Sequence, residues 1–177
     1  MAAYIVYTDA SVRHAGLEHS GSCYAVALTS SRGTILNLRS GRIAQEDNPL
    51  YSSLIAELHA VLQGILAAQH LDGSVLIRTD CLALVRQIDV YRASATSGRL
   101  ISPGRNPILR QLHALIPQVG NVPVKCENRS PLIRVVDRHS KMAHGCPEEK
   151  VKEYLDKARS GDYDHLLATT TEYCEVH

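Results

Sequence analysis

The sequence contains no tryptophan and no phenylalanine, and eight tyrosines are its only other large aromatic side chains. Proteins that bind nucleic-acid strands by stacking the bases use aromatic platforms. We therefore do not expect base stacking to be the main means by which this chain binds any ligand.

An excess of positive or negative charge is also absent. The chain has 19 Lys and Arg against 18 Asp and Glu, a formal net charge of +1. This balance excludes a histone-like or polybasic protein, so any affinity for nucleic acid has to come from local patches.

The five cysteines lack the C-x-x-C spacing of a zinc site or a redox motif. They are Cys23, Cys81, Cys126, Cys146 and Cys174. Their number is odd, which indicates reduced thiols, and we expect a cytoplasmic protein.

Long apolar runs are absent as well. No eighteen apolar residues follow one another, and the first apolar run is too short for a signal peptide because Asp9 interrupts it. We expect a soluble protein with no membrane segment, and a monomer. The length of 177 residues with 45% hydrophobic content fits one core. We predict one domain over 1–160 and a polar, weakly patterned C-terminal tail over 161–177.

Hydrophobic periodicity and turn residues predict the elements along the chain. The predicted strands cover 3–9, 21–29, 34–42, 74–79 and 132–136. The predicted helices cover 48–70, with Asn48-Pro49 at its start, then 82–91, 107–116 and 147–160. The segments 92–106 and 117–131 are predicted as an exposed connection and a turn-rich stretch. This order predicts an α/β protein, a mixed sheet with helices on its faces.

Three acidic residues stand where a buried element meets the surface. Asp9 ends the first predicted strand, Glu57 lies within the first helix, and Asp80 ends the fourth strand. Each of them alone would be an ordinary solvated residue. Together they suggest one metal-binding pocket that hydrolyses a phosphodiester.

In this order the motifs resemble those of the ribonuclease H family. The matching segments are Tyr7-Thr8-Asp9-Ala10-Ser11, Ile55-Ala56-Glu57-Leu58-His59-Ala60 and Ile77-Arg78-Thr79-Asp80-Cys81. The resemblance covers about residues 3 to 160. It implies the ribonuclease H-like fold, a five-stranded mixed sheet with helices on both faces.

The resemblance also implies an activity and its cofactors. The chain would be an endoribonuclease that cuts the RNA strand of RNA/DNA hybrids with two Mg²⁺ or Mn²⁺ ions. Asp9 would bridge the two ions, while Glu57 and Asp80 would each hold one of them. Two ions about 3.5–4 Å apart stabilise the attacking and the leaving oxygen of an in-line displacement.

The fourth metal ligand of the family is usually an aspartate, in an Asn-x-x-Ala-Asp motif. Here the corresponding stretch is Ser140-Lys141-Met142-Ala143-His144, so we predict His144 as the fourth ligand. Imidazole would tilt the preference toward manganese. Asp137 is the rival for this position. His139 is either a proton shuttle or an exposed side chain, and we favour the exposed side chain.

Substrate contacts are predicted from the same resemblance. Ser11, Ser52 and Ser53 match positions that contact phosphates or sugar hydroxyls, although helix capping explains the latter two equally well. Leu54 stands where the family often has an asparagine. Five arginines occupy the place of a basic protrusion that grips the DNA strand, unless they are simply solvated: Arg86, Arg92, Arg99, Arg105 and Arg110.

Two other functions are compatible with the sequence. One is a nuclease of the same superfamily that acts on DNA or branched substrates, as junction resolvases do. The other is a catalytically silent nucleic-acid-binding domain that has lost its fourth carboxylate.

Overall fold

A five-stranded mixed sheet forms the centre of the molecule. A computed structural model describes residues 2–14, 16, 19–98 and 102–169. The strands are β1 Tyr4–Arg13, β2 Gly21–Ser30, β3 Ile35–Ile43, β4 Val75–Thr79 and β5 Val124–Cys126. They lie in the order β3-β2-β1-β4-β5, in which β1, β2 and β3 are antiparallel while β4 and β5 run parallel to β1.

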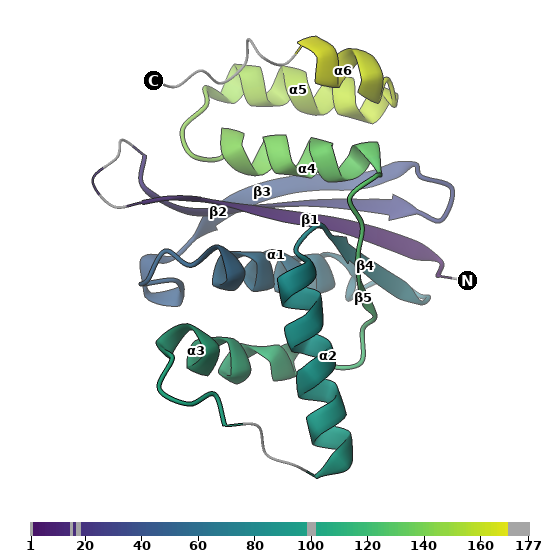
Figure 1. Cartoon of the computed structure of the whole chain (residues 1–177). Helices are drawn as coiled ribbons and strands as arrows, with labels where there is room; N and C mark the ends of the chain where they lie inside the picture. Colours follow the sequence, from purple (N-terminus) through teal and green to yellow (C-terminus); the bar gives the residue numbers. More distant parts are fainter. Residues whose placement is uncertain (1, 15, 17–18, 99–101, 170–177) are drawn as a thin grey trace.

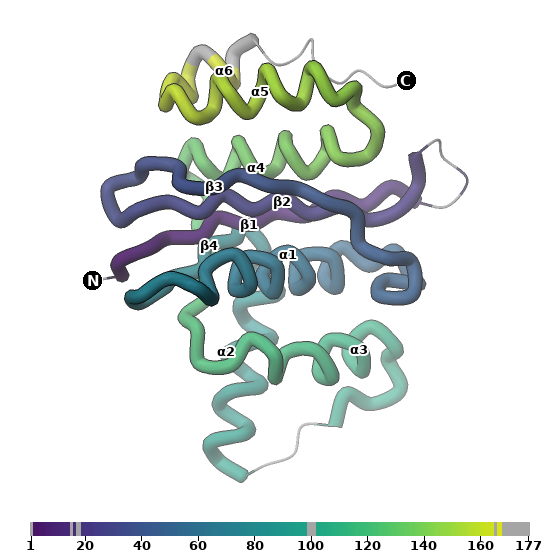
Figure 2. Tube along the Cα trace, turned by 180° about the vertical axis from the view of Figure 1, so that it is seen from behind, coloured from purple at the N-terminus to yellow at the C-terminus, as the bar shows by residue number. Residues whose placement is uncertain are grey.

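Helices cover both faces of this sheet, as the fold prediction requires (Figure 1). One face carries α1 Ser53–Ala68, α2 Leu82–Ser97, α3 Pro107–Leu115 and the 3-10 helix η2 Ile116–Val119. The other face carries α4 Pro131–Met142, with α5 Glu148–Ser160 and α6 Tyr163–Thr169 stacked beyond it. A further 3-10 helix, η1 Gln45–Asp47, leads from β3 toward α1. The view from behind shows the same layers (Figure 2).

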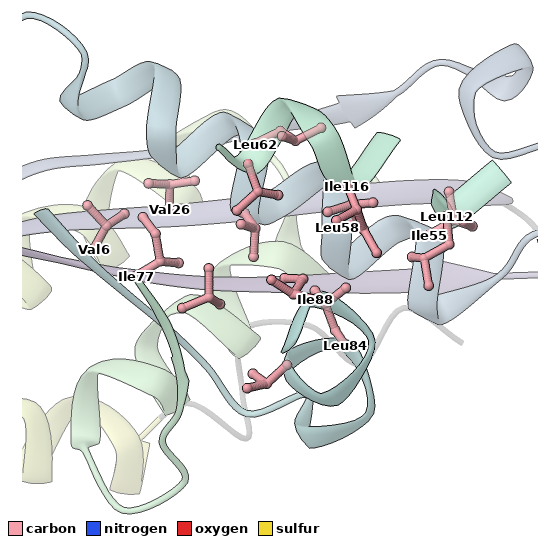
Figure 3. Packing of buried hydrophobic residues seen from close by; sticks show 14 of the residues in the cluster. Val6, Val26, Ile55, Leu58, Leu62, Ile77, Leu84, Ile88, Leu112 and Ile116 are labelled. Carbon is pink, nitrogen blue, oxygen red and sulfur yellow. The ribbon is translucent and has the colours of Figure 1, made fainter. Parts of the chain in front are cut away.

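Helix α1 is apolar on more than one side because it is enclosed. It contacts β1, β2 and β4 on one side and α2, α3 and η2 on the other. Its buried Leu58 belongs to a core that Val6, Val26 and Ile77 contribute from the sheet (Figure 3). Burying side chains of this size stabilises the fold by about 1.5–3 kcal/mol each.

Glycine 64 lets α1 approach the sheet closely. A Cβ atom at Gly64 would lie 2.9 Å from Cγ2 of Thr8 and 3.0 Å from Cγ1 of Val6. Such distances are too short for any larger residue without a shift of the helix or of these side-chain methyl groups. The close approach fixes the position of α1 relative to β1, and each of these two elements carries a predicted site residue.

Helix α4 packs on the opposite face of β1 and β2. The sheet offers small side chains there, Ala25 and Ala27, both fully buried. The helix covers them with Leu132, Val135 and other side chains that recur at helical spacing.

The prediction of a strand over 132–136 is wrong, because these residues form the first half of α4. Ser130 caps the helix by accepting a hydrogen bond from the Leu132 amide, and Pro131 occupies the first turn. The buried apolar residues of this segment recur at helical spacing, and the polar His139 and Ser140 continue the same buried face. The fifth strand is instead β5, a three-residue edge strand inside the segment predicted as turns.

Several predicted boundaries also shift. β1 continues past Asp9 to Arg13 because β2 pairs with it along its whole length. α1 begins at Ser53 with Ser52 as its cap, and Asn48 is buried before it. α2 extends to Ser97 rather than ending near Tyr91.

The predicted tail begins with a helix. α6 contacts α4 and α5, and its Leu166 is buried. It therefore packs on α4 and α5. Residues 170–177 lie outside the described part of the chain, and the domain boundary at residue 160 stays a prediction. Within the described ranges, no helix is long and apolar enough to span a membrane.

His139, predicted as exposed or as a proton shuttle, is neither exposed nor among the predicted metal ligands. It is 1% exposed, and its ring lies 6.4 Å from that of Tyr154 in α5, measured between centroids. Its Nδ1 has no hydrogen-bond partner among the residues that the structure describes. Burial, helped by the positive Arg159, lowers the pKa of His139 to about 4.

This buried histidine predicts an acid-sensitive fold. Between about pH 6.5 and 4 the unfolded chain binds a proton at His139 that the folded protein does not, so stability falls as the pH falls through this window. The loss contributed by His139 reaches about 3 kcal/mol near pH 4. Urea unfolding of wild type and His139→Leu at pH 7 and pH 4.5 measures it as the difference in pH dependence. Equal pH dependence of the two proteins would contradict the prediction.

Candidate metal centre

The three predicted acids meet at one point of the fold. Asp9 lies within β1, Glu57 in the first half of α1, and Asp80 directly after β4. Each offers a carboxylate oxygen, and these oxygens lie within 4.8 Å of one another. The distance is short enough for shared divalent cations.

The end of β4 creates the space for this group. β4 pairs with β1 only as far as the pair Tyr7 and Arg78, two residues before Asp9. Asp80 therefore leaves the sheet beside the middle of β1, where no strand in the described part of the chain pairs with that side of β1. Residues beyond the carboxyl end of a parallel strand are common ligand positions in open α/β sheets.

Hydrogen bonds fix the buried Glu57 carboxylate. The Ala10 amide donates to Oε1 at 3.3 Å, and the Thr79 hydroxyl donates to Oε2 at 3.3 Å. The donors belong to β1, which carries Asp9, and to β4, which Asp80 directly follows. The two hydrogen bonds thus restrict the Glu57 side chain to a rotamer that points toward Asp9 and Asp80.

Asp9 has a partner that the sequence pattern does not reveal. The Ser140 hydroxyl of α4 donates to Oδ2 of Asp9 at 2.7 Å, and both residues are buried. Ser140 lies 131 residues away in sequence, beyond a segment predicted as a strand. Only the packing of α4 over β1 could identify it.

Burial and crowding make the three acids hard to ionise together. Desolvation raises the pKa of Asp9 to about 7, with Asp137 and Asp80 adding to the rise and Ser140 opposing it. Desolvation, then Asp9 and Asp80, raise the pKa of Glu57 well above its usual value. The more exposed Asp80 has its pKa raised by desolvation and by Asp137. A bound cation would relieve each of these costs.

Asp137 lies close enough to act on the same group. Its negative charge raises the pKa of both Asp9 and Asp80. It is on α4 rather than at the end of a strand, one turn before Ser140. Its carboxylate forms an ion pair with Lys141 at 2.6 Å and remains 41% exposed.

His144, predicted as the fourth ligand, is not in the acid group. Its Nδ1 faces the carbonyl oxygen of His19 at 3.1 Å, and its Nε2 faces the Ser11 hydroxyl at 2.7 Å. A carbonyl only accepts, so Nδ1 carries the proton and Nε2 accepts from Ser11. Burial lowers the pKa of His144, which favours this neutral form. The lone pair that would bind a metal is therefore already used by Ser11. Asp137, whose charge acts on Asp9 and Asp80, stays the rival candidate for the fourth ligand.

The two candidates for the fourth ligand, Asp137 and His144, predict opposite results for their variants. If Asp137 completes the carboxylate set of a nuclease, as the resemblance implies, Asp137→Asn would lower the rate of cleavage by about 10–100-fold, while His144→Gln, which keeps a partner for Ser11, would change it less than about fivefold. Initial rates at several Mn²⁺ concentrations separate an effect on metal affinity from an effect on turnover. The reverse order of the two variants would restore His144 as the ligand.

The predicted substrate residues have mixed surroundings. Ser11 is half-buried and bonded to His144. Ser52 caps α1 and accepts a hydrogen bond from the Ile55 amide at 3.4 Å. Helix capping, which the sequence offered as an alternative to substrate contact, therefore describes the role of Ser52 in the structure. Ser53 is exposed at the first residue of α1.

The arginine-rich stretch is only partly available for contacts. Arg86 is exposed on α2. Arg92 donates to the carbonyls of Gly120 and Val122, at 2.8 and 2.7 Å, and so ties α2 to the segment before β5. Arg105 and Arg110 are exposed, while Arg99 lies outside the described residues.

Comparison with solved structures identifies related folds. The chain superposes on a foamy viral protease-reverse transcriptase solved with double-stranded DNA, with a TM-score of 0.62 at 17% identity, covering 81% of this chain and 95% of that one. It superposes on the foamy viral enzyme solved with an RNA/DNA hybrid with a TM-score of 0.64 at 15% identity, over 81% of this chain. It spans only 20% of that second chain.

A cellular enzyme gives a similar result. Ribonuclease H1 from the halophilic archaeon Halobacterium salinarum superposes with a TM-score of 0.56 at 17% identity, covering 79% of this chain and 96% of that one. No protein-family model and no curated protein sequence matches the chain. The likeness is therefore one of fold.

Proposed function

We propose that this chain, which has the ribonuclease H-like fold, is a metal-dependent endonuclease that hydrolyses the RNA strand of RNA/DNA hybrids. The observation that carries the proposal is the convergence of Asp9, Glu57 and Asp80, with oxygens within 4.8 Å of one another. Carboxylates collected this closely from three separate elements are costly unless cations neutralise them. The likeness to an enzyme solved with an RNA/DNA hybrid supports the choice of substrate.

The donor set fits hard cations. Asp9, Glu57 and Asp80 offer only carboxylate oxygens, and Asp137 would add another, a set that suits Mg²⁺ or Mn²⁺. Two such ions would supply charge stabilisation for the attacking and the leaving oxygen. With His144 engaged elsewhere, nothing in the set favours manganese specifically.

The chain's own residues prepare the site. The Ser140 hydroxyl holds one oxygen of Asp9, and the Ala10 amide and Thr79 hydroxyl hold Glu57. Each carboxylate has further lone pairs, which these bonds do not use and which could bind a cation. The arrangement is pre-organised, so little side-chain freedom is lost when ions and substrate bind.

A substrate panel tests the proposal. An end-labelled RNA/DNA hybrid, single-stranded RNA, duplex DNA and a four-way DNA junction are incubated with the protein in Mg²⁺, in Mn²⁺ and in EDTA. We expect cuts within the RNA of the hybrid in either ion and none in EDTA. Preference for duplex or branched DNA would support a different nuclease of this fold. Hybrid binding without metal binding or cleavage would indicate a silent binding domain.

We further propose a monomer located in the cytoplasm, where thiols stay reduced. Cys23, Cys81 and Cys126 are not in disulfides, which supports this location.

A further inference from the structure

Helices α5 and α6 form a layer outside α4. Figure 1 shows α4 between this layer and the sheet, and Figure 2 shows the same order from behind. α4 contacts β1 and β2 on its inner side and α5 and α6 on its outer side, and α5 and α6 contact each other. The enclosed helix carries Ser140, which bonds to Asp9, and Asp137, the candidate fourth ligand.

Apolar packing on the sheet restrains the rotation of α4 about its axis only weakly. The sheet presents the small, buried Ala25 and Ala27 to this helix, and apolar burial has no preferred direction. One residue corresponds to about 100° of rotation in an α-helix. A rotation of this size would move His139 or Lys141 to the place where Ser140 bonds to Asp9. The metal centre therefore depends on directional contacts that hold α4 at one angle.

Electrostatic repulsion acts against the placement of α4. Desolvation and then the charge of Asp137 raise the pKa of both Asp9 and Asp80. When these acids are ionised and no cation is bound, their repulsion pushes α4 away from β1. The Ser140 hydroxyl opposes this from the inner side of the helix. Contacts on the outer side of α4 add to the restraint.

Tyr154 of α5 makes such a directional contact. Its side chain is fully buried, and its hydroxyl donates to the carbonyl oxygen of Val135 at 3.0 Å. Its ring lies 6.4 Å from that of His139, one turn after Val135, measured between centroids. Burial raises the pKa of the Tyr154 hydroxyl, so the group keeps its proton and remains a donor. The bond restrains both the rotation and the height of α4 relative to α5.

Arg138, the residue after Asp137, connects α4 to α6. Its Nη1 donates to the carbonyl oxygen of Leu167 at 3.4 Å. This carbonyl lies in the last turn of α6, where helical carbonyls have no partner within the helix. The neighbouring Leu166 is buried in the core that α4 shares with the sheet. α6 is thereby anchored and restrains Arg138 in turn.

We infer that α5 and α6 hold α4 at the metal centre, with Tyr154 and Arg138 as positioning residues that keep Ser140 and Asp137 beside Asp9. Both act through the backbone of α4, because Val135 is two residues, or about 3 Å along the helix axis, before Asp137. The inference rests on the proposed function. It gives the outer helices a part in cation binding besides their contribution to the core.

Titration with Mn²⁺ tests the inference without the need for cleavage. Isothermal titration calorimetry compares the affinity of wild type and of Tyr154→Phe/Arg138→Gln for this ion, and initial rates on a labelled hybrid are measured over the same range. The double variant is expected to bind Mn²⁺ about tenfold more weakly and to cleave within about threefold of the wild-type rate at saturating Mn²⁺. Removing the positive Arg138 beside Asp137 would by itself strengthen cation binding, so weaker binding indicates lost positioning.

Tyr163→Phe is the matched control. It removes the same hydroxyl group from the same outer layer, and within the described ranges this hydroxyl donates no hydrogen bond to α4. The control should leave the Mn²⁺ affinity within about twofold of wild type. A double variant that matches Tyr163→Phe overturns the inference and leaves the proposed function standing.

A second background separates positioning from general destabilisation. Ser140→Ala/Asp137→Asn removes the groups that α4 presents to the metal centre and keeps the three convergent acids. Adding Tyr154→Phe/Arg138→Gln to this background should weaken Mn²⁺ binding less than about twofold. The full tenfold loss expected in wild type, if it recurs in this background, also overturns the inference.

The remaining outcomes distinguish the inference from the proposed function. Wild type that binds Mn²⁺ but cleaves no hybrid overturns the proposed function alone, and wild type that binds no Mn²⁺ overturns both. Thermal melting verifies folding. The single Tyr154→Phe variant, which loses one oxygen atom, replaces the double variant if that does not fold.

Discussion

Asp9→Asn should lower the rate of hybrid cleavage by at least about 1000-fold, equivalent to about 4 kcal/mol of transition-state stabilisation. Asp9 shares the acid group with Glu57 and Asp80, and its charge acts on Glu57. The amide keeps the size of the side chain and one acceptor oxygen, but it removes the charge that would be shared between two cations. Single-turnover cleavage of a labelled hybrid in Mg²⁺ and in Mn²⁺ measures the loss.

Asp89→Asn serves as the control. Asp89 is an exposed acid on α2, so the variant changes the net charge equally without touching the acid group. It should keep activity within about twofold. If Asp9→Asn retains a comparable rate while folded, the metal centre lies elsewhere and the proposed function is wrong.

The second large effect concerns the metal-free protein. Burial raises the pKa of Asp9 to about 7 in the folded state, whereas its ordinary value, which applies to the unfolded chain, is 3.8. The folded state therefore binds more protons between these two values, and its stability falls as the pH rises through this window. A difference of about three pKa units corresponds to a loss of about 4 kcal/mol above pH 7.

Removing the charge should reverse this loss. In EDTA at pH 8, Asp9→Asn should be more stable than wild type by about 2–4 kcal/mol, and the difference should vanish near pH 4. Urea unfolding at the two pH values measures it. Saturating Mn²⁺ should stabilise wild type more than the variant, because the ion replaces the proton. A variant less stable than wild type at pH 8 in EDTA would contradict the expected cost of ionising Asp9.

The cost of ionising these acids also means that activity and stability should oppose each other here. The acids are placed to bind a cation, and without one their ionisation lowers the stability of the folded protein. Glu57 shows this most clearly, because it is 7% exposed and has two hydrogen bonds but no positive partner in the described residues. Sites of this kind commonly reduce the stability of the empty protein.

The sequence patterns correctly predicted the type, strand or helix, of three strongly apolar elements. The central strand carrying Asp9, the helix carrying Glu57 and the strand before Asp80 are each strongly apolar, so their type follows from local residues. The motifs on them were sufficient to predict that the three acids meet. The three motifs follow one another in the same order as in the ribonuclease H family. The structure confirms that the three carboxylates converge.

Tertiary contacts decide the features that the sequence patterns do not. Residues 132–136 are rich in β-branched and apolar side chains, but they form a helix because the sheet face beneath them carries Ala25 and Ala27 and accepts a helix closely. His144 matched a motif position, yet its ring nitrogens are used by Ser11 and His19, which the sequence does not place nearby. Asp137 was predicted at the end of a strand because the same segment was predicted as that strand.

The amino-acid sequence alone determined the α/β class, the central strands and the three acids, because these depend on hydrophobic period and on motifs within single elements. Only the tertiary structure decided the bonding of His144 to Ser11 and the Ser140 contact with Asp9. Each of these joins residues about 130 positions apart, and such contacts depend on how α4 packs on β1 rather than on local propensity.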